Sequence, residues 1–214
     1  MTILSIDLGT THAKVGLYQQ DGCCLQFASR CMKTHHAPGG WDYFDPQEVT
    51  STITGLIQEV MAGQPEPVEA VGVTSMAETG ILLDRKTGRL CSPFIPWFET
   101  ASQASADRIL ESTDAGECYQ KFGLKATFKV SLAKVLWLRD TQNIALEERV
   151  WLSTADYVVY WLTGKIQTDF SLASRTFAFR VDRKEWDREW LERWQLPVDL
   201  FPPVDFPVIT VTTI

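Results

Sequence analysis

The stretch SIDLGTTHAKVGLY, Ser5 to Tyr18, decides the fold. An apolar run ends next to Asp7, and a second apolar run follows a turn formed by Gly9, Thr10 and Thr11. Backbone N–H groups and hydroxyls in such a turn can bind an anion, and glycine allows a close approach. A carboxylate beside the turn can hold Mg²⁺, directly or through water. The stretch therefore fits either a capped hairpin turn or half of a phosphate site.

The segments around this hairpin predict a mixed sheet. Alternating and apolar runs separated by turn residues indicate strands, and the Asp45-Pro46 pair with Glu48 indicates the start of a helix that stops at Gly63. The predicted strands are 3–8, 12–19, 24–32, 69–76 and 80–90. An initial three-stranded meander followed by a helix and a strand is typical of an α/β fold with a ribonuclease-H-like core, here with a mixed five-stranded sheet.

The second half of the chain is mainly helical by its periodicity. The predicted helices are 99–113, 115–122, 130–142, 154–163 and 185–194, and residues 168–181 have β character. Gly123 and Gly164 suit the positions just after two of these helices. The sequence thus predicts a helical insertion beside the sheet.

Composition excludes several classes of partner. The net charge is -7 with a pI of about 5.0, so a nucleic-acid surface is not expected. No apolar run reaches the length of about 18 residues that a membrane helix requires. The five cysteines lack zinc-ligand spacing and predict reduced, mostly buried thiols. With no basic leader segment, these features predict a cytoplasmic protein.

Eight stretches, in order along the chain, resemble one family. They are Asp7–Thr11, Gly40–Pro46, Gly72–Thr79, Ile95–Trp97, Lys134–Leu138, Ala155–Tyr157, Leu162–Gly164 and Thr168–Thr176. The chain resembles the N-terminal domain of the FGGY carbohydrate kinases, which belong to the sugar kinase, heat-shock-70 and actin superfamily. The resemblance implies an actin-like ATPase domain, ATP and Mg²⁺ as cofactors, and a small sugar as substrate. A homo-oligomer is left open.

The resemblance also implies roles for single residues. Gly9, Thr10 and Thr11 correspond to the turn that faces the phosphates, and Asp7 to the carboxylate near the metal. Lys14 on the second strand either adds charge there or points to solvent.

Two further positions match the sugar site of the family. Glu78 corresponds to the residue that bonds a substrate hydroxyl, a role that suits a carboxylate acceptor. The alternative is an acidic residue in a surface turn. Trp97 corresponds to the tryptophan that packs against the substrate carbons, and its alternative is simple core packing in a chain with eight tryptophans.

Departures from the family pattern concern the substrate. Ala77 stands where glycerol kinases have an arginine, so a bidentate fork for polyol hydroxyls is missing there. Met76 replaces a glutamine and Leu172 an asparagine. These changes argue against glycerol and favour a less common sugar or sugar acid.

Length is the largest departure. Family members are about twice as long, so residues 1–205 are expected to form the sugar-side domain and 206–214 an atypical tail, with the nucleotide domain absent. The general base is expected beyond residue 214, which leaves no catalytic residue in this chain and predicts an inactive isolated domain. Two alternatives stay open: a non-catalytic sugar-binding or regulatory domain, and a nuclease-like enzyme with Asp7, Glu78 and Asp169 as a metal cluster.

Overall fold

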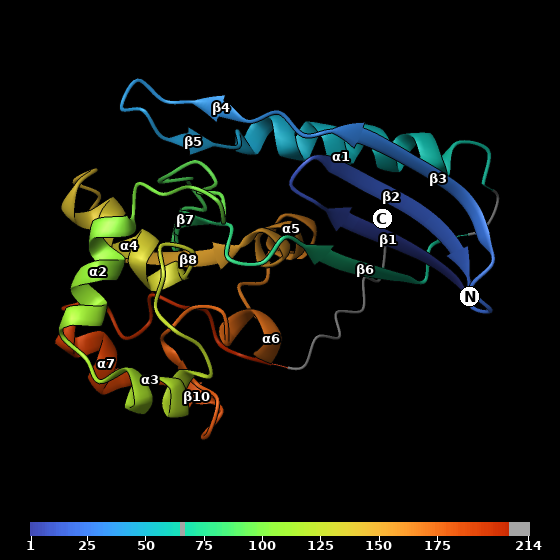
Figure 1. Cartoon of the computed structure of the whole chain (residues 1–214). Helices are drawn as coiled ribbons and strands as arrows, with labels where there is room; N and C mark the ends of the chain where they lie inside the picture. Colours follow the sequence, from blue (N-terminus) through green and yellow to red (C-terminus); the bar gives the residue numbers. More distant parts are fainter. Residues whose placement is uncertain (65–66, 206–214) are drawn as a thin grey trace.

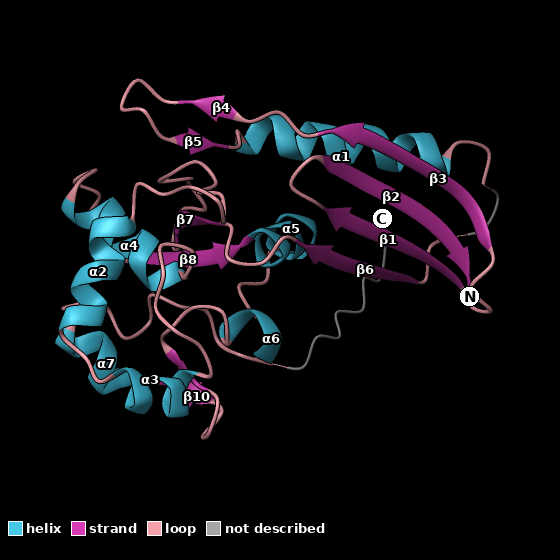
Figure 2. Cartoon of the chain, viewed as in Figure 1, coloured by secondary structure: helices cyan, strands magenta, loops and turns pink. Residues whose placement is uncertain are grey.

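The computed structural model describes residues 1–64 and 67–205, and it places a four-stranded mixed sheet beside a mainly helical part (Figure 1, Figure 2). The sheet has the order β3-β2-β1-β6, with β1 (Thr2–Leu8), β2 (His12–Gln19), β3 (Cys24–Cys31) and β6 (Ala70–Ser75). β1 and β2, and β2 and β3, are antiparallel, whereas β6 runs parallel to β1. The α/β class, the meander and the mixed sheet are confirmed.

β1 shows why the opening stretch forms a strand. Leu4, Ile6 and Leu8 are fully buried, while the residues between them are half-buried. This alternation has the period of two that a pleated strand requires. The strand therefore anchors the sheet in the core and carries Asp7 on the opposite face.

Helix α1 (Pro46–Met61) packs against β2 and β3. Asp45 caps it, because its Oδ1 accepts hydrogen bonds from the N–H groups of Gln47 at 2.7 Å and Glu48 at 3.2 Å. Glu48, which the sequence pattern placed in the first turn, contacts His35 Nε2 with its carboxylate at 2.7 Å. His35 lies in a short hairpin of β4 (His35–His36) and β5 (Asp42–Tyr43).

The expected fifth strand does not join the sheet. β7 (Gly80–Asp84) pairs antiparallel with β8 (Arg149–Ser153), a strand that the sequence pattern did not reveal. A Cβ atom at Gly80 would lie 2.4 Å from the Trp151 ring, so only glycine permits this close pairing. β7 is buried along its whole length, and such a strand carries no periodic signal that identifies its neighbour.

Four helices lie within their predicted ranges: α2 (Gln103–Glu111), α3 (Ala115–Phe122), α4 (Ser131–Asp140) and α5 (Thr154–Thr163). Gly123 and Gly164 end α3 and α5 with φ values of 72° and 71°, in the left-handed region that favours glycine. Both predicted helix ends are confirmed.

The strand expected over 168–181 is wrong for most of its length. Asp169 accepts a hydrogen bond from the Leu172 N–H at 2.9 Å and so begins a short helix, α6 (Phe170–Ala173). Only β9 (Phe179–Arg180) is extended, and it pairs with β10 (Glu185–Trp186). The helix expected from 185 begins later, as α7 (Arg188–Arg193), because Asp187 is its N-cap.

Buried apolar side chains form two core clusters, one under the sheet and one among the helices α2, α3, α4 and α7. β7 belongs to both, since Ile81 and Leu83 face the first cluster and Leu82 faces the second. The two halves are therefore packed through a shared strand.

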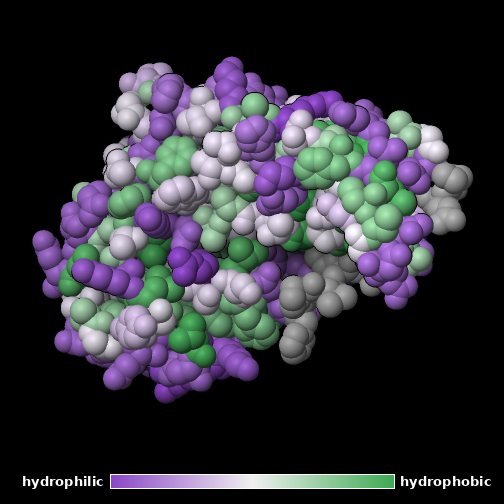
Figure 3. Space-filling model, turned by 45° about the vertical axis from the view of Figure 1, so that its right-hand side comes forward, coloured by the Kyte–Doolittle hydropathy of each residue, from purple (hydrophilic) through white to green (hydrophobic). Residues whose placement is uncertain are grey.

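The surface is mixed. Hydrophilic side chains are spread between smaller apolar areas on the face in Figure 3. No helix among the described residues has the length and apolar character needed to cross a membrane.

All five cysteines are free, but Cys23, Cys24 and Cys31 are exposed, so the expectation of mostly buried thiols is wrong. The predicted tail, 206–214, lies outside the described residues.

Candidate functional site

The turn between β1 and β2 is closed by one hydrogen bond, from the Gly9 N–H to the His12 carbonyl at 2.9 Å. A Cβ at Gly9 would lie 3.1 Å from that carbonyl, which makes the position tight for any other residue. The N–H groups of Thr10 and Thr11 donate to no acceptor within residues 1–64 and 67–205. Adjacent N–H groups without an acceptor are a feature of turns that bind anions.

The two threonine side chains of this turn differ. The Thr10 hydroxyl accepts a hydrogen bond from Trp97 Nε1 at 2.9 Å and contacts the Met76 sulfur at 3.8 Å. The Thr11 side chain is exposed and lies 3.3 Å from His12 Nδ1. Thr10 thus ties the turn to Trp97 and Met76, whereas the Thr11 hydroxyl contacts the neighbouring His12 ring and is exposed.

Trp97 is held at both of its N–H groups. Its ring nitrogen donates to Thr10, and its backbone N–H donates to the buried Thr79 hydroxyl at 2.9 Å. The ring is half-buried, and the Lys129 ammonium lies 5.0 Å from its centroid. Trp97 is therefore held in a fixed orientation, with part of its side chain exposed.

Glu78 precedes Thr79, whose hydroxyl accepts the Trp97 backbone N–H. Its φ is 60°, a left-handed conformation that non-glycine residues rarely adopt. Arg175 binds Oε1 of Glu78 with two nitrogens, and the contact from Nε measures 2.8 Å. Oε2 of Glu78 accepts no hydrogen bond from the described part of the chain, so one carboxylate oxygen remains open to a hydroxyl.

Two charged side chains, Lys134 and Glu99, are buried near Glu78. Lys134 on α4 has no exposed surface, and its ammonium donates to the Lys129 carbonyl. Burial lowers the pKa of Lys134 to about 7, although Glu78 and Glu99 favour its charged form. Glu99 is also buried and accepts hydrogen bonds from the N–H groups of Ala101 and Asp42.

Asp7 lies at the end of β1, on the side of the hairpin that carries Lys14. The Lys14 ammonium is 3.0 Å from Asp7 Oδ2, and both side chains are partly exposed. Lys14 therefore pairs with Asp7 instead of facing solvent alone.

A single accessible carboxylate fits Mg²⁺, because this ion is usually held by one or two carboxylates together with water and phosphate oxygens. Asp7 would supply that contact. The described residues contain no group of three or more His, Cys, Asp or Glu that could hold a metal by themselves. The nuclease-like alternative requires Asp7, Glu78 and Asp169 to bind metal together. The structure argues against it, because Glu78 is bound by Arg175 and Asp169 caps α6.

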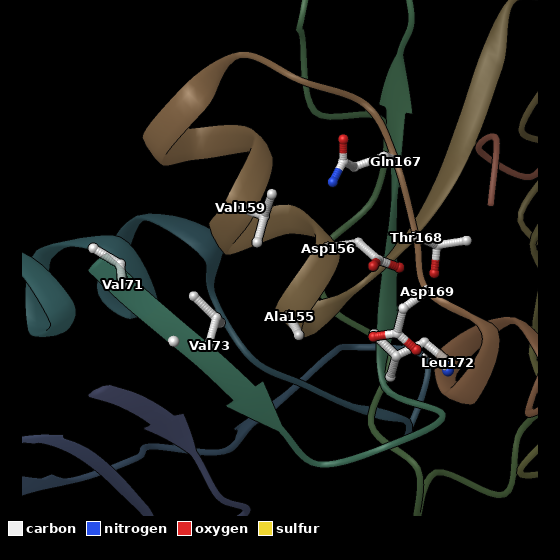
Figure 4. A pocket seen from close by; sticks show the side chains of 10 residues that line it. Val71, Val73, Ala155, Asp156, Val159, Gln167, Thr168, Asp169 and Leu172 are labelled. Atoms are coloured by element: carbon white, nitrogen blue, oxygen red, sulfur yellow. Dashed lines mark hydrogen bonds between the residues drawn. The ribbon is translucent and has the colours of Figure 1, made fainter. Parts of the chain in front are cut away.

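A separate cavity of about 180 Å³ lies between β6, α5 and the segment before α6 (Figure 4). Its walls include Val71 and Val73 from β6, and the Asp156 and Asp169 carboxylates point toward it. Burial raises the pKa of Asp156 to about 7. None of the predicted sugar or phosphate residues lines this cavity.

The structure thus brings Thr10 and Trp97 into direct contact and places Glu78 beside them. Arg175, Lys129, Lys134 and Glu99 were not predicted as members of the site. Arg175 and Lys134 both lie in stretches that carry the family resemblance, and this could have pointed to them. Lys129 gave no signal in the sequence.

Comparison with known proteins identifies the family. The profile of the FGGY family of carbohydrate kinases, N-terminal domain, matches residues 2–206. The chain belongs to this family, of which it contains the N-terminal domain.

Individual relatives agree with this assignment. The glycerol kinase of Carboxydothermus hydrogenoformans is 31% identical over 212 residues, which are 94% of this chain and 42% of that protein. Gluconate kinase from Lactobacillus acidophilus has the same fold, with a TM-score of 0.87 at 21% identity over 99% of this chain and 44% of the other. Glycerol kinase from Plasmodium falciparum gives 0.87 at 23% identity, covering 95% and 42%. The chain spans less than half the length of these relatives.

Proposed function

We propose that this chain is the sugar-side part of an ATP-dependent carbohydrate kinase, which transfers the γ-phosphoryl group of ATP to a hydroxyl of a sugar or sugar acid. The observation that carries the proposal is the contact between the hairpin turn and the predicted sugar site. One hydrogen bond of 2.9 Å joins Thr10 in the predicted phosphate turn to Trp97 in the predicted sugar site. A phosphate donor and a sugar bound at these two places would therefore be neighbours.

Each group has a role in this proposal. The open oxygen of Glu78 accepts hydrogen bonds from substrate hydroxyls, and the fixed ring of Trp97 packs against the sugar carbons. The free N–H groups of Thr10 and Thr11 bind phosphate oxygens. Bound at Asp7, Mg²⁺ would neutralise charge on the phosphates.

Each carboxylate of the proposed site is held by a cation or by backbone N–H groups, and this argues against a general base among them. Arg175 binds Glu78, Lys14 binds Asp7, and backbone N–H groups bind Glu99. We therefore propose that the 214 residues bind sugar without phosphorylating it. The general base, the nucleotide domain, the cytoplasmic location and any homo-oligomer stay predictions.

A non-catalytic sugar-binding or regulatory role is the second candidate, favoured by the same occupied carboxylates. It uses the same sugar site, and so a binding experiment tests the part that both candidates share.

Saturation-transfer NMR on the purified chain would test the sugar site with a panel of alditols, ketoses, aldoses and aldonic acids. At least one should bind, and Glu78→Gln should weaken it about tenfold, since a hydrogen bond to a charged group is lost. Glu117→Gln is the matched control, because Glu117 pairs with Lys121 on the surface of α3. Absence of binding by the whole panel, or equal binding by Glu78→Gln, would contradict the proposal.

A further inference from the structure

Lys129 lies beside the proposed sugar site, and the described residues offer it no counter-ion. Its ammonium is 5.0 Å from the Trp97 ring centroid and 5.9 Å from the Phe128 ring centroid, and the residue is half-buried. We propose that Lys129 selects substrates that carry a carboxylate, so that this site takes a sugar acid and not a neutral polyol. This inference rests on the proposed function and names its substrate class.

The charges around Lys129 leave its ammonium uncompensated. Lys129 forms no ion pair within the described residues. The carboxylates nearby are engaged by other groups: Glu78 by Arg175, and Glu99 by two backbone N–H groups. The Lys134 amine beneath offers no negative charge, and it uses the Lys129 carbonyl as its acceptor.

This arrangement is unlike that of an ordinary surface lysine. An exposed ammonium without a partner is fully hydrated, whereas Lys129 is drawn onto two aromatic rings, which attract cations weakly. A half-buried cation with only aromatic partners is able to form a strong charge-assisted hydrogen bond to an arriving anion.

The position of Trp97 limits where that anion would lie. The Thr10 hydroxyl accepts from the ring nitrogen and the Thr79 hydroxyl from the backbone N–H, each at 2.9 Å, and Lys129 lies over the ring. A sugar that packs on Trp97 and bonds Glu78 through a hydroxyl would bring a terminal carboxylate within reach of the flexible Lys129 side chain. The substrate carboxylate would then pair with Lys129, because the other cation, Arg175, is already paired with Glu78.

Ala77, which stands where glycerol kinases have an arginine, fits a preference for a charged substrate. A neutral polyol is recognised by several hydrogen bonds to its hydroxyls, and the arginine fork expected for that purpose is absent at this position. Arg175 does not replace it, because both of its contacting nitrogens bind Glu78. A single carboxylate–ammonium contact would supply the binding energy that the missing fork does not.

Matched ligand pairs test the inference by calorimetric titration of the 214-residue chain. Each pair would contain an aldonate and the alditol of the same carbon skeleton, such as D-gluconate with D-glucitol and D-xylonate with D-xylitol. We expect at least one aldonate to bind about tenfold more tightly than its alditol, from one charge-assisted hydrogen bond. Added salt should weaken the aldonate and leave the alditol unchanged.

Three variants assign the preference to Lys129. Lys129→Met should bring the aldonate down to the affinity of its alditol, and Lys129→Arg should keep the preference. Lys125→Met is the matched control, since Lys125 is an exposed lysine of the same segment, and it should change nothing. The indole region of the NMR spectrum would show that each variant is folded.

The outcomes separate the two proposals. If neither member of any pair binds, the sugar site itself is wrong and the inference falls with it. If both members bind equally, or if Lys129→Met keeps the preference for the aldonate, the sugar site stands and only the role of Lys129 is overturned.

Discussion

Thr10 connects the two parts of the proposed site through one hydroxyl group. It accepts the Trp97 indole N–H at 2.9 Å and contacts the sulfur of Met76 at the end of β6. The hydroxyl expected to face phosphate is therefore used in part to position the tryptophan. The free backbone N–H groups of the turn remain for the anion.

Replacing Thr10 tests this connection. Thr10→Val keeps the shape of the side chain but leaves the Trp97 indole N–H without its acceptor, so we expect a loss of about 1 kcal/mol in the free energy of unfolding. The Trp97 indole signal should move as well. Denaturant unfolding and ¹⁵N NMR would measure both.

Thr11→Val is the control, because the Thr11 hydroxyl is exposed. It should leave the unfolding free energy and the Trp97 signal nearly unchanged. Equal effects of the two substitutions would show that the Thr10 hydrogen bond does not hold Trp97.

Single residues also show how far the sequence could predict the site. Glu78 and Trp97 were expected from their motifs, but their partners come from distant segments. Arg175 is 97 residues from Glu78, and Thr10 is 87 residues from Trp97. Lys129 has no local pattern, because an ammonium over a ring is created only by the packing of separate loops.

At the scale of elements, α5 begins with a buried acid. Ser153 and Asp156 form a capping box, in which the Ser153 N–H donates to Asp156 Oδ2 and the Asp156 N–H donates to Ser153 Oγ, each at 3.1 Å. Burial raises the pKa of Asp156 from 3.8 to about 7, and the nearby Asp169 adds to the increase. The carboxyl group is therefore protonated in the folded chain at pH values where it is ionised in the unfolded chain.

This difference predicts a pH dependence of stability. Between pH 4 and pH 7 the folded state binds a proton that the unfolded state does not, so the free energy of unfolding should fall as the pH rises through this window. Each unit of pKa shift corresponds to about 1.4 kcal/mol. Asp156→Asn should remove this part of the slope, as measured by urea unfolding at a series of pH values.

Asp114→Asn is a matched control, because Asp114 caps α3 from an exposed position. It should lower stability without changing the slope in that window. An unchanged slope in Asp156→Asn would contradict the account of Asp156.

The elements that sequence predicted well are those with a local signal. Asp45 and Pro46 fixed the start of α1, and the hairpin residues fixed β1 and β2. β8 was not found, and β7 was assigned to the wrong sheet, because both are buried on both faces and their pairing depends on tertiary packing. The stretch 168–181 was misread because Asp169 acts as an N-cap.

At the scale of the whole molecule, the chain covers 42% of the glycerol kinase of Carboxydothermus hydrogenoformans. We expect the isolated 214-residue chain to show no sugar-dependent formation of ADP, because each carboxylate at its proposed site is held by a cation or by backbone N–H groups. ³¹P NMR with ATP, Mg²⁺ and the sugar panel would measure this. Sugar-dependent turnover that disappears in Glu78→Gln would contradict the expectation.

The location of a bound sugar tests the central claim most directly. The chain has eight tryptophans, so its ¹⁵N spectrum should contain eight indole signals, and Trp97→Phe identifies one of them. Titration with the tightest ligand of the panel should move the Trp97 signal saturably and more than the other seven. Saturable binding that leaves the Trp97 signal in place would show that sugar binds elsewhere and would contradict the account.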